Sequence, residues 1–169
     1  MNVVSSAVSA LQVEPIDIGI TPEPTNTGEK VGLVGFNSWL WVNNPSERTT
    51  GPINRTVTTG VITVNLNAVN TGLAVNYGDG LPTIPPVCPV NSIPYTDAAM
   101  DLPSPTCNHF LGKSSQGHPG GVFRPSVSSI WLVTWSAITS TASFGGTIPI
   151  TPTATTEVRV GEMQVLVTK

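Results

Sequence analysis

The sequence has few charged residues, few cysteines and no long apolar run, and each shortage excludes a class of protein. Charged residues make up 10% of the chain, compared with roughly 25% in an ordinary soluble domain. The 7 Lys and Arg residues are scattered, so there is no basic stripe and we expect no nucleic-acid partner. No apolar run approaches the roughly 18 residues of a membrane-spanning helix, and we expect no membrane span in this chain.

Turn-forming and strand-forming residues are what the chain has in quantity. It contains 16 glycines and 16 prolines, and threonine, valine, serine and asparagine fill much of the rest. Because Thr and Val favour strands while Gly and Pro interrupt them, this composition predicts an all-β fold. At 169 residues the chain is long enough to bury a core and has the length of one domain.

The two cysteines, Cys88 and Cys107, lie in a proline-rich stretch. A disulfide between them would close a loop of about 20 residues and stabilise the fold by about 3 kcal/mol in the chain-entropy model. Free thiols would instead indicate a reducing compartment. A structural zinc site needs four ligands, and only His109 and His118 could join the cysteines, in poor chelating positions. We predict the disulfide, and we expect neither a metal nor a cofactor.

Alternation of apolar and polar residues predicts the main strands. The clearest case is residues 62–68, where Ile62, Val64, Leu66 and Ala68 alternate with polar residues. This alternation is typical of a half-buried strand, and we predict that these apolar residues face the core. In the extended stretch 122–138, the residues predicted to share the buried face are Phe123, Val127, Trp131, Val133 and Trp135. Further strands are predicted over residues 31–34, 38–42, 55–58, 73–77, 150–156 and 157–167, with a turn or bulge at 70–72.

Two regions do not follow this pattern. The first 28 residues are predicted to form an extension, with a short helix over 5–13 and an extended piece, 17–20, that docks on a sheet edge. Residues 81–121 are predicted to form one long loop, tethered by the disulfide, with a helical turn near 97–100. Loops of this length are uncommon in compact domains and are usually functional or tethered. The predicted organisation is an extension, 1–28, followed by a β-sandwich, 29–169.

Several segments together resemble a family of uncharacterised actinobacterial exported proteins with a polycystic-kidney-disease (PKD)-like domain. The resemblance runs in order along nearly the whole chain. The segments that carry it are Asp17–Ile20, Ser38–Val42, Tyr77–Gly80, Ser104–His109, Ser114–Ser115, Pro119–Gly121, Trp131–Trp135 and Val160–Val167.

The resemblance implies an Ig-like, PKD-like β-sandwich in an extracellular or cell-envelope location, reached through an export signal that has been removed. The first residues, Met1–Val4, lack the charged start and apolar stretch of such a signal, as a cytosolic protein also would. An aromatic residue and an Asp usually precede the PKD turn, where this chain has Val75 and Asn76. We expect Asn76 to cap the turn through its side-chain oxygen, and Tyr77 or a tryptophan to fill the space of the missing aromatic.

The candidate site residues are few, and we predict structural roles for them. Gly78, Asp79 and Gly80 form the turn, where the Asp79 carboxylate caps backbone amides. His109 and His118 flank a pair of serines, but nothing in the sequence marks the constrained turn and oxyanion hole that a catalytic serine requires. We predict no catalysis by either histidine, and hydrogen bonding in the loop as their role.

A contact surface is predicted on the outer face of the stretch 122–138. If its tryptophans face the core, Ile130 and Leu132 face outward, and two large apolar residues on an outer sheet face indicate a contact surface. A covering by the N-terminal segment would explain them equally well. We include His109 and His118 of the long loop in the predicted surface.

We predict a non-catalytic binding or assembly module that makes protein–protein contacts at the cell surface. Its expected partners are cell-envelope proteins, with self-association as a further interaction. A charge-poor surface relies on shape and apolar area for recognition, and a disulfide would order residues 81–121 before binding. The alternatives are an envelope enzyme, a carbohydrate-binding accessory domain, or a structural subunit of a virion or filament.

Overall fold

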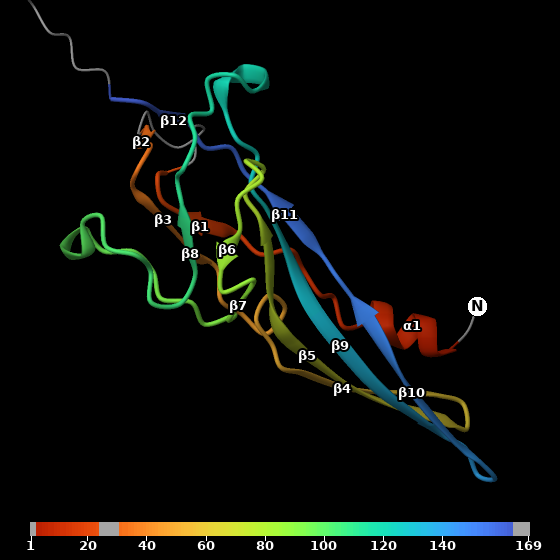
Figure 1. Ribbon diagram of the computed structural model, residues 1–169. Helices are drawn as coiled ribbons and strands as arrows, with labels where there is room; N and C mark the ends of the chain where they lie inside the picture. The colour runs from red at the N-terminus through yellow and green to blue at the C-terminus, as the bar shows by residue number, and fades with distance from the viewer. Residues whose placement is uncertain (1–2, 24–30, 164–169) are drawn as a thin grey trace, which may run out of the picture.

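The computed structural model describes residues 3–23 and 31–163 of the chain. Within these residues nearly all regular structure is β-strand, which confirms the predicted all-β, sandwich-like fold (Figure 1). One short helix, α1 (Val3–Ser9), precedes the strands, and two 3₁₀ turns, η1 (Asp97–Ala99) and η2 (Pro119–Gly121), lie between them. No helix in these two ranges is long and apolar enough to cross a membrane.

The strands form two main sheets and one small parallel pair. The large sheet has the order β10–β9–β5–β4, with β11 added to β9 and β7 added to β5. Its strands are β4 (Ile53–Thr59), β5 (Ile62–Asn76), β7 (Val87–Cys88), β9 (Ser126–Ile138), β10 (Ser143–Ile150) and β11 (Thr153–Thr155). The small sheet has the order β1–β3–β8–β6, from β1 (Ile18–Ile20), β3 (Asn37–Val42), β8 (Asn108–Phe110) and β6 (Thr83–Ile84). The parallel pair is β2 (Gly32–Leu33) with β12 (Val160–Gly161).

The long strands β5 and β9 run through two parts of the molecule. We call the small sheet, residues 73–76 of β5, residues 126–129 of β9 and the segments around them the head. We call β4, β10, residues 62–70 of β5 and residues 130–138 of β9 the arm. Figure 1 shows the arm extending away from the head and ending in the β4–β5 and β9–β10 turns.

A bulge in β5 separates the arm from the head. Asn70 pairs with Trp131 of β9, and the next pair along is Leu73 with Ser129, so three steps of β5 match two steps of β9. The extra residue keeps Leu73 on the buried face, whereas strict alternation after Asn70 would turn it outward. The predicted turn or bulge at 70–72 is therefore confirmed as a bulge, and it lets one strand contribute to both cores.

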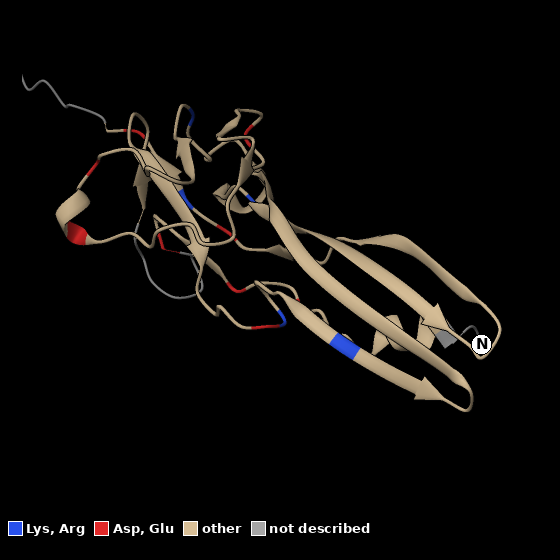
Figure 2. Ribbon diagram, turned by 90° about the horizontal axis from the view of Figure 1, so that it is seen from below, with Lys and Arg blue, Asp and Glu red and all other residues tan. Residues whose placement is uncertain are grey.

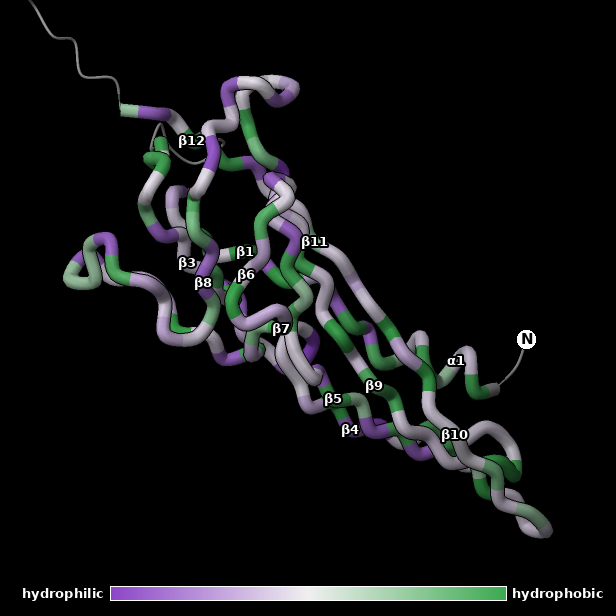
Figure 3. The backbone as a smooth tube through the Cα atoms, in the orientation of Figure 1, coloured by the Kyte–Doolittle hydropathy of each residue, from purple (hydrophilic) through white to green (hydrophobic). Residues whose placement is uncertain are grey.

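Each part has its own core. The head core lies between the small sheet and the head ends of β5 and β9, and includes Leu40, Val42, Leu73, Tyr77, Phe123 and Val127. The arm core lies on one face of the large sheet, where α1 and the turn after it contribute Ala7 and Leu11. The strand residues of this core are Ile53, Val64, Leu66, Ala68, Trp131, Val133 and Ala137, with Trp135 partly buried. Figure 3 shows the resulting alternation of apolar and polar residues along β5 and β9.

The N-terminal extension belongs to both cores. As predicted, it contains a short helix and an extended edge piece, although the helix begins and ends earlier than residues 5–13. Ile18 to Ile20 pair with Val42 to Leu40 at the edge of the small sheet, and both isoleucines are buried in the head core. The predicted domain boundary at residue 28 lies in the range 24–30, outside the described residues.

The prediction of one long loop over residues 81–121 is wrong in part. This segment supplies β6, β7 and β8, and β8 pairs with β3 on one side and with β6 on the other. The segment therefore provides an inner strand of the small sheet. Strands of two or three residues are too short to show alternation, which is why the sequence pattern misses them. The predicted helical turn near 97–100 is present as η1.

The sequence pattern also misses β10, because Gly145 and Gly146 interrupt its apolar residues. Pairing with β9 from Ser143 to Ile150 makes β10 the outermost strand on one side of the arm. The predicted strands over 150–156 and 157–167 correspond to β11 and, in part, to β12. Val165 and Val167 lie in the range 164–169, outside the described residues.

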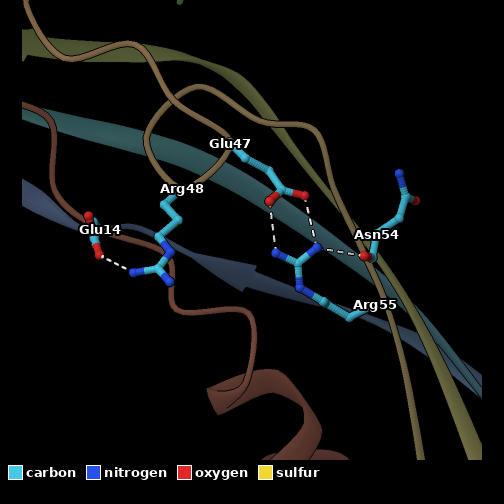
Figure 4. Close-up of polar contacts among 5 residues, drawn as sticks. All are labelled: Glu14, Glu47, Arg48, Asn54 and Arg55. Atoms are coloured by element: carbon cyan, nitrogen blue, oxygen red, sulfur yellow. Dashed lines mark hydrogen bonds and ion pairs between the residues drawn. The ribbon is translucent and has the colours of Figure 1, made fainter.

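Among the described residues, Arg55 of β4 is the only charged residue of the arm, and the others lie in the head or near its junction with the arm (Figure 2). The sequence has no charged residue between Arg55 and Asp79, or between Arg124 and Glu157. Arg55 of β4 bonds both carboxylate oxygens of Glu47, each at 2.8 Å, and the pKa of Glu47 is lowered chiefly by this hydrogen bond (Figure 4). Such exposed ion pairs contribute little stability. The Arg55–Glu47 pair lies near the junction between the head and the arm, and the rest of the arm has no charged residue.

Candidate functional site

Cys88 and Cys107 form a disulfide, with their Cα atoms 5.2 Å apart. Both cysteines are fully buried in the head core. The bond ties β7, which is paired to the large sheet, to the residue before β8 in the small sheet. The predicted disulfide is confirmed, and a stable disulfide is typical of an oxidising, non-cytoplasmic environment.

The turn at residues 78–80 has the predicted form. Gly78 and Gly80 have φ values of 87° and 79°, a left-handed conformation that glycine adopts without steric cost. The Asn76 side-chain oxygen accepts a hydrogen bond from the Gly78 amide at 3.0 Å, and Asp79 Oδ1 accepts one from the Leu81 amide at 2.9 Å. Both capping predictions are therefore confirmed.

Asp79 also has a partner that the sequence does not indicate. Its second oxygen, Oδ2, accepts a hydrogen bond from His109 Nε2 at 2.9 Å, and neither side chain is exposed to solvent. The ring of Tyr77 stacks on the His109 ring, with 4.0 Å between centroids and 4° between planes. Tyr77 is fully buried in the head core.

Strand pairing places two hydroxyl residues beside this cluster. Ser38 of β3 and Thr83 of β6 lie directly opposite His109 on its two sides. The four atoms Ser38 Oγ, Tyr77 OH, Thr83 Oγ1 and His109 Nδ1 are buried without a hydrogen-bond partner in the part of the chain that the structure describes. A charge-assisted contact and several unpaired polar atoms thus lie together at the centre of the head.

The residue types of this cluster match a hydrolytic Ser/His/Asp triad, but its members are more deeply buried than the residues of an accessible catalytic site. Ser38 and His109 have no exposed surface, so a substrate has no route to the hydroxyl. A catalytic triad needs its serine beside an open site with oxyanion donors. We assign the cluster a structural role, in which Asp79 and His109 fix the 78–80 turn against β8.

The predicted contact surface is wrong for His109, which lies fully inside the head. Its place on the inner strand β8, opposite Ser38 and Thr83, accounts for the burial. His118 is exposed and packs edge-on against Phe123, with 4.7 Å between ring centroids. On the arm, Leu132 is 44% exposed and Ile130 is partly buried.

A larger group of exposed apolar residues lies on the head, in the segment expected to be a loop. We call Ile84, Ile93, Met100, Leu102 and Phe110 the head patch. Their exposed fractions are 66%, 49%, 76%, 61% and 52% in that order. Sequence alternation could not find them, because Ile84 and Phe110 lie in strands of two and three residues and the other three residues lie outside strands.

Strand pairing and a hydrogen bond place the segments that carry four residues of the head patch over the outer face of the small sheet. Ile84 pairs with Asn108, two residues before Phe110, so both side chains lie on the face opposite His109. The segment carrying Met100 and Leu102 crosses the neighbouring strand, where Trp39 Nε1 donates to the Leu102 carbonyl at 2.8 Å. The patch is thus an ordered surface.

A groove with a cavity volume of about 520 Å³ lies beside this segment. Its lining includes the carboxylates Asp17, Glu23 and Asp97 and the rings of Trp41 and Tyr95. Among the described residues, no group of three His, Cys, Asp or Glu is arranged to hold a metal ion. The groove therefore brings aromatic residues and acidic residues together in one lining.

Replacing Tyr77 by phenylalanine is expected to remove an alkaline instability. Burial raises the pKa of Tyr77 well above its usual range, and the nearby Asp79 raises it further, while Ser38 opposes the shift. The unfolded chain loses this proton above about pH 10 and the folded chain keeps it. Stability is therefore intact below about pH 10 and falls above it by about 1.4 kcal/mol per pH unit. Urea unfolding from pH 8 to 11.5 measures the fall.

Tyr77→Phe keeps the stacked ring and removes a hydroxyl that has no hydrogen-bond partner in the described chain. It should match the wild type near pH 8 and exceed it at pH 11. The matched control, Tyr95→Phe, should retain the alkaline fall. Identical pH profiles for Tyr77→Phe and the wild type would show that Tyr77 ionises equally in both states.

Comparisons with known proteins leave the PKD-like and envelope assignments as predictions from the sequence. No protein-family model, no curated protein and no solved structure matches this chain.

Proposed function

We propose that the protein is a non-catalytic protein-binding module of the cell surface or cell envelope, and that the head patch is its contact surface. The observation that carries the proposal is the exposure of five large apolar side chains on one ordered segment. Large exposed apolar patches on soluble proteins commonly mark interaction sites. Aromatic residues and methionine, both present in the patch, are enriched at protein interfaces.

The disulfide supports this role. It anchors both ends of the segment that carries Ile93, Met100 and Leu102, because Cys88 and Cys107 flank it. Hydrogen bonds from Asn37 to the Asp101 carbonyl and from Trp39 to the Leu102 carbonyl fix its middle. A surface ordered before binding loses less entropy when a partner docks.

The location is inferred from two arguments. The disulfide favours an oxidising compartment, and the resemblance to exported actinobacterial proteins favours the cell envelope within that class. Apart from Arg55, the arm has no charged residue, which fits a module that recognises partners by shape and apolar contact.

The carbohydrate-binding alternative would use the groove beside Trp41 and Tyr95, since aromatic faces and carboxylates bind sugars through stacking and hydrogen bonds. It would leave the head patch without a function. The two sites can be separated by mutation, because Trp41 lines the groove and is not part of the patch.

The test is capture of envelope proteins by the purified domain. We expect Leu102→Asp/Phe110→Asp to abolish capture, because a carboxylate on each side of the patch has to be desolvated at the interface. The matched control is Leu132→Asp, which changes an apolar residue of similar exposure on the arm and should leave capture intact. Thermal unfolding of each variant checks that the head stays folded.

Loss of capture in Leu132→Asp alone would place the contact on the arm face predicted from the sequence. Capture that survives both variants and is lost in Trp41→Ala, together with binding to a glycan array, would favour the carbohydrate-binding alternative. Either result would overturn the head patch as the binding surface.

A further inference from the structure

We propose that a second copy of this chain docks on the free edge of β10 and forms a two-fold, antiparallel strand pair with it. The proposal concerns the arm and is independent of the head patch. It rests on three features of β10, which are its unpaired edge, its lack of charge and the complementary shapes of Phe144 and Gly146.

β10 is the last strand on its side of the large sheet, and the described chain covers only one of its edges. Opposing residues in an antiparallel ladder are either hydrogen-bonded or non-hydrogen-bonded pairs. The Thr139 amide donates to the Ala142 carbonyl at 2.9 Å, so Thr139 and Ala142 are a hydrogen-bonded pair. Because such pairs alternate along an antiparallel ladder, Phe144, Gly146 and Ile148 bond to β9. The backbone groups of Ser143, Gly145 and Thr147 therefore point away from the sheet.

Pro149 restricts where a partner strand can bind. It belongs to the outward-pointing set, opposite Leu132, and has no amide hydrogen to donate. A two-fold pair centred on Gly145 sets Ser143 opposite Thr147 of the second copy, and Thr147 opposite Ser143. This register uses all three free donors and leaves Pro149 outside the pair.

The same register places a large side chain of one copy opposite a glycine of the other. Residues opposite each other in an antiparallel pair share a face, so Phe144 of one copy lies opposite Gly146 of the other. Phe144 is 59% exposed, and Gly146 offers a bare backbone beside the Trp135 ring. The phenyl ring would thus cover a glycine on the apolar face, and the symmetry repeats the contact.

Charge favours a second copy as the occupant. A strand that pairs with itself brings identical side chains close together, which is unfavourable when those side chains are charged. β10 has no charged residue, and no residue between Arg124 and Glu157 is charged. Natural proteins commonly protect exposed edges with lysine or proline. Here Pro149 protects one end and nothing charged protects residues 143–147.

Sedimentation of the purified protein over a range of concentrations tests the pairing. We expect a monomer–dimer equilibrium that Phe144→Ala/Thr147→Pro shifts to monomer by at least tenfold in dissociation constant. Thr147→Pro removes an outward amide, and Phe144→Ala removes the phenyl ring. The matched control on the opposite edge of the sheet, Thr58→Lys, should dimerise like the wild type.

A cross-link tests the register. In a hydrogen-bonded antiparallel pair the Cα atoms lie about 5.5 Å apart, within the range of a disulfide. Ser143→Cys/Thr147→Cys should therefore give a covalent dimer on mild oxidation, and Ser143→Cys alone should give far less. A monomer at every concentration would overturn the proposal, as would a dimer that Phe144→Ala/Thr147→Pro leaves intact or that Thr58→Lys abolishes.

Discussion

Asp79→Ala is expected to lower the free energy of unfolding by about 2–6 kcal/mol, because it leaves two hydrogen-bond donors inside the head without an acceptor, at a cost of about 1–3 kcal/mol each. The Asp79 carboxylate accepts hydrogen bonds from the Leu81 amide and from His109 Nε2. His109 Nδ1 has no hydrogen-bond partner in the described chain, so the substitution would leave both ring nitrogens unpaired in the core. Urea unfolding at neutral pH measures the loss.

Asp97→Ala is the matched control, because Asp97 is an exposed acid of the head and its loss should change stability by no more than about 0.5 kcal/mol. Asp79→Asn keeps an acceptor for the Leu81 amide and should cost less than Asp79→Ala. A double-mutant cycle with His109→Phe isolates the contact between the two side chains. Additive losses in that cycle would show that Asp79 and His109 stabilise the head separately.

The strands and the buried face of the arm could be predicted from the sequence because the strands β5 and β9 are long. Over β5 and β9, alternation runs for enough residues to define a buried face, and the predicted inward positions of Leu66, Trp131 and Val133 are confirmed. The bulge was also readable, since the turn residues at 70–72 interrupt two alternating runs. Long-range pairing was not needed for these predictions.

The centre of the head could not be predicted in the same way. His109 and Asp79 are 30 residues apart in sequence, and they meet only because β8, a strand of three residues, inserts between β3 and β6. No local pattern marks so short a strand. The apparent loop and the missed contact between Asp79 and His109 therefore have one cause, which is that tertiary pairing, and not periodicity, orders residues 81–121.

The turn at residues 78–80 is the part of the head that could be predicted from the sequence. Gly78 and Gly80 signal left-handed backbone positions in any context, and the capping side chains Asn76 and Asp79 act over two residues. These features depend on local geometry alone, so the sequence predicted them correctly. The second role of Asp79, toward His109, needed the fold.

Trp131→Ala is expected to lower the free energy of unfolding by about 3–5 kcal/mol, the usual cost of deleting a large, fully buried aromatic side chain. Trp131 has no exposed surface and lies in the arm core between β5 and β10. Its indole nitrogen has no hydrogen-bond partner in the described chain, so the loss reflects packing and the cavity left behind.

The neighbouring residue on the same strand supplies the matched control for Trp131. Leu132 points to the opposite face and is 44% exposed, so Leu132→Ala should cost less than about 1 kcal/mol. Trp131→Phe, which keeps a ring in the site, should fall between the two and remains measurable if Trp131→Ala does not fold. Thermal unfolding should show a fall of about 10 °C for Trp131→Ala in a chain of this length. Equal losses for Trp131→Ala and Leu132→Ala would contradict the assignment of inner and outer faces to β9, and with it the arm core beneath α1.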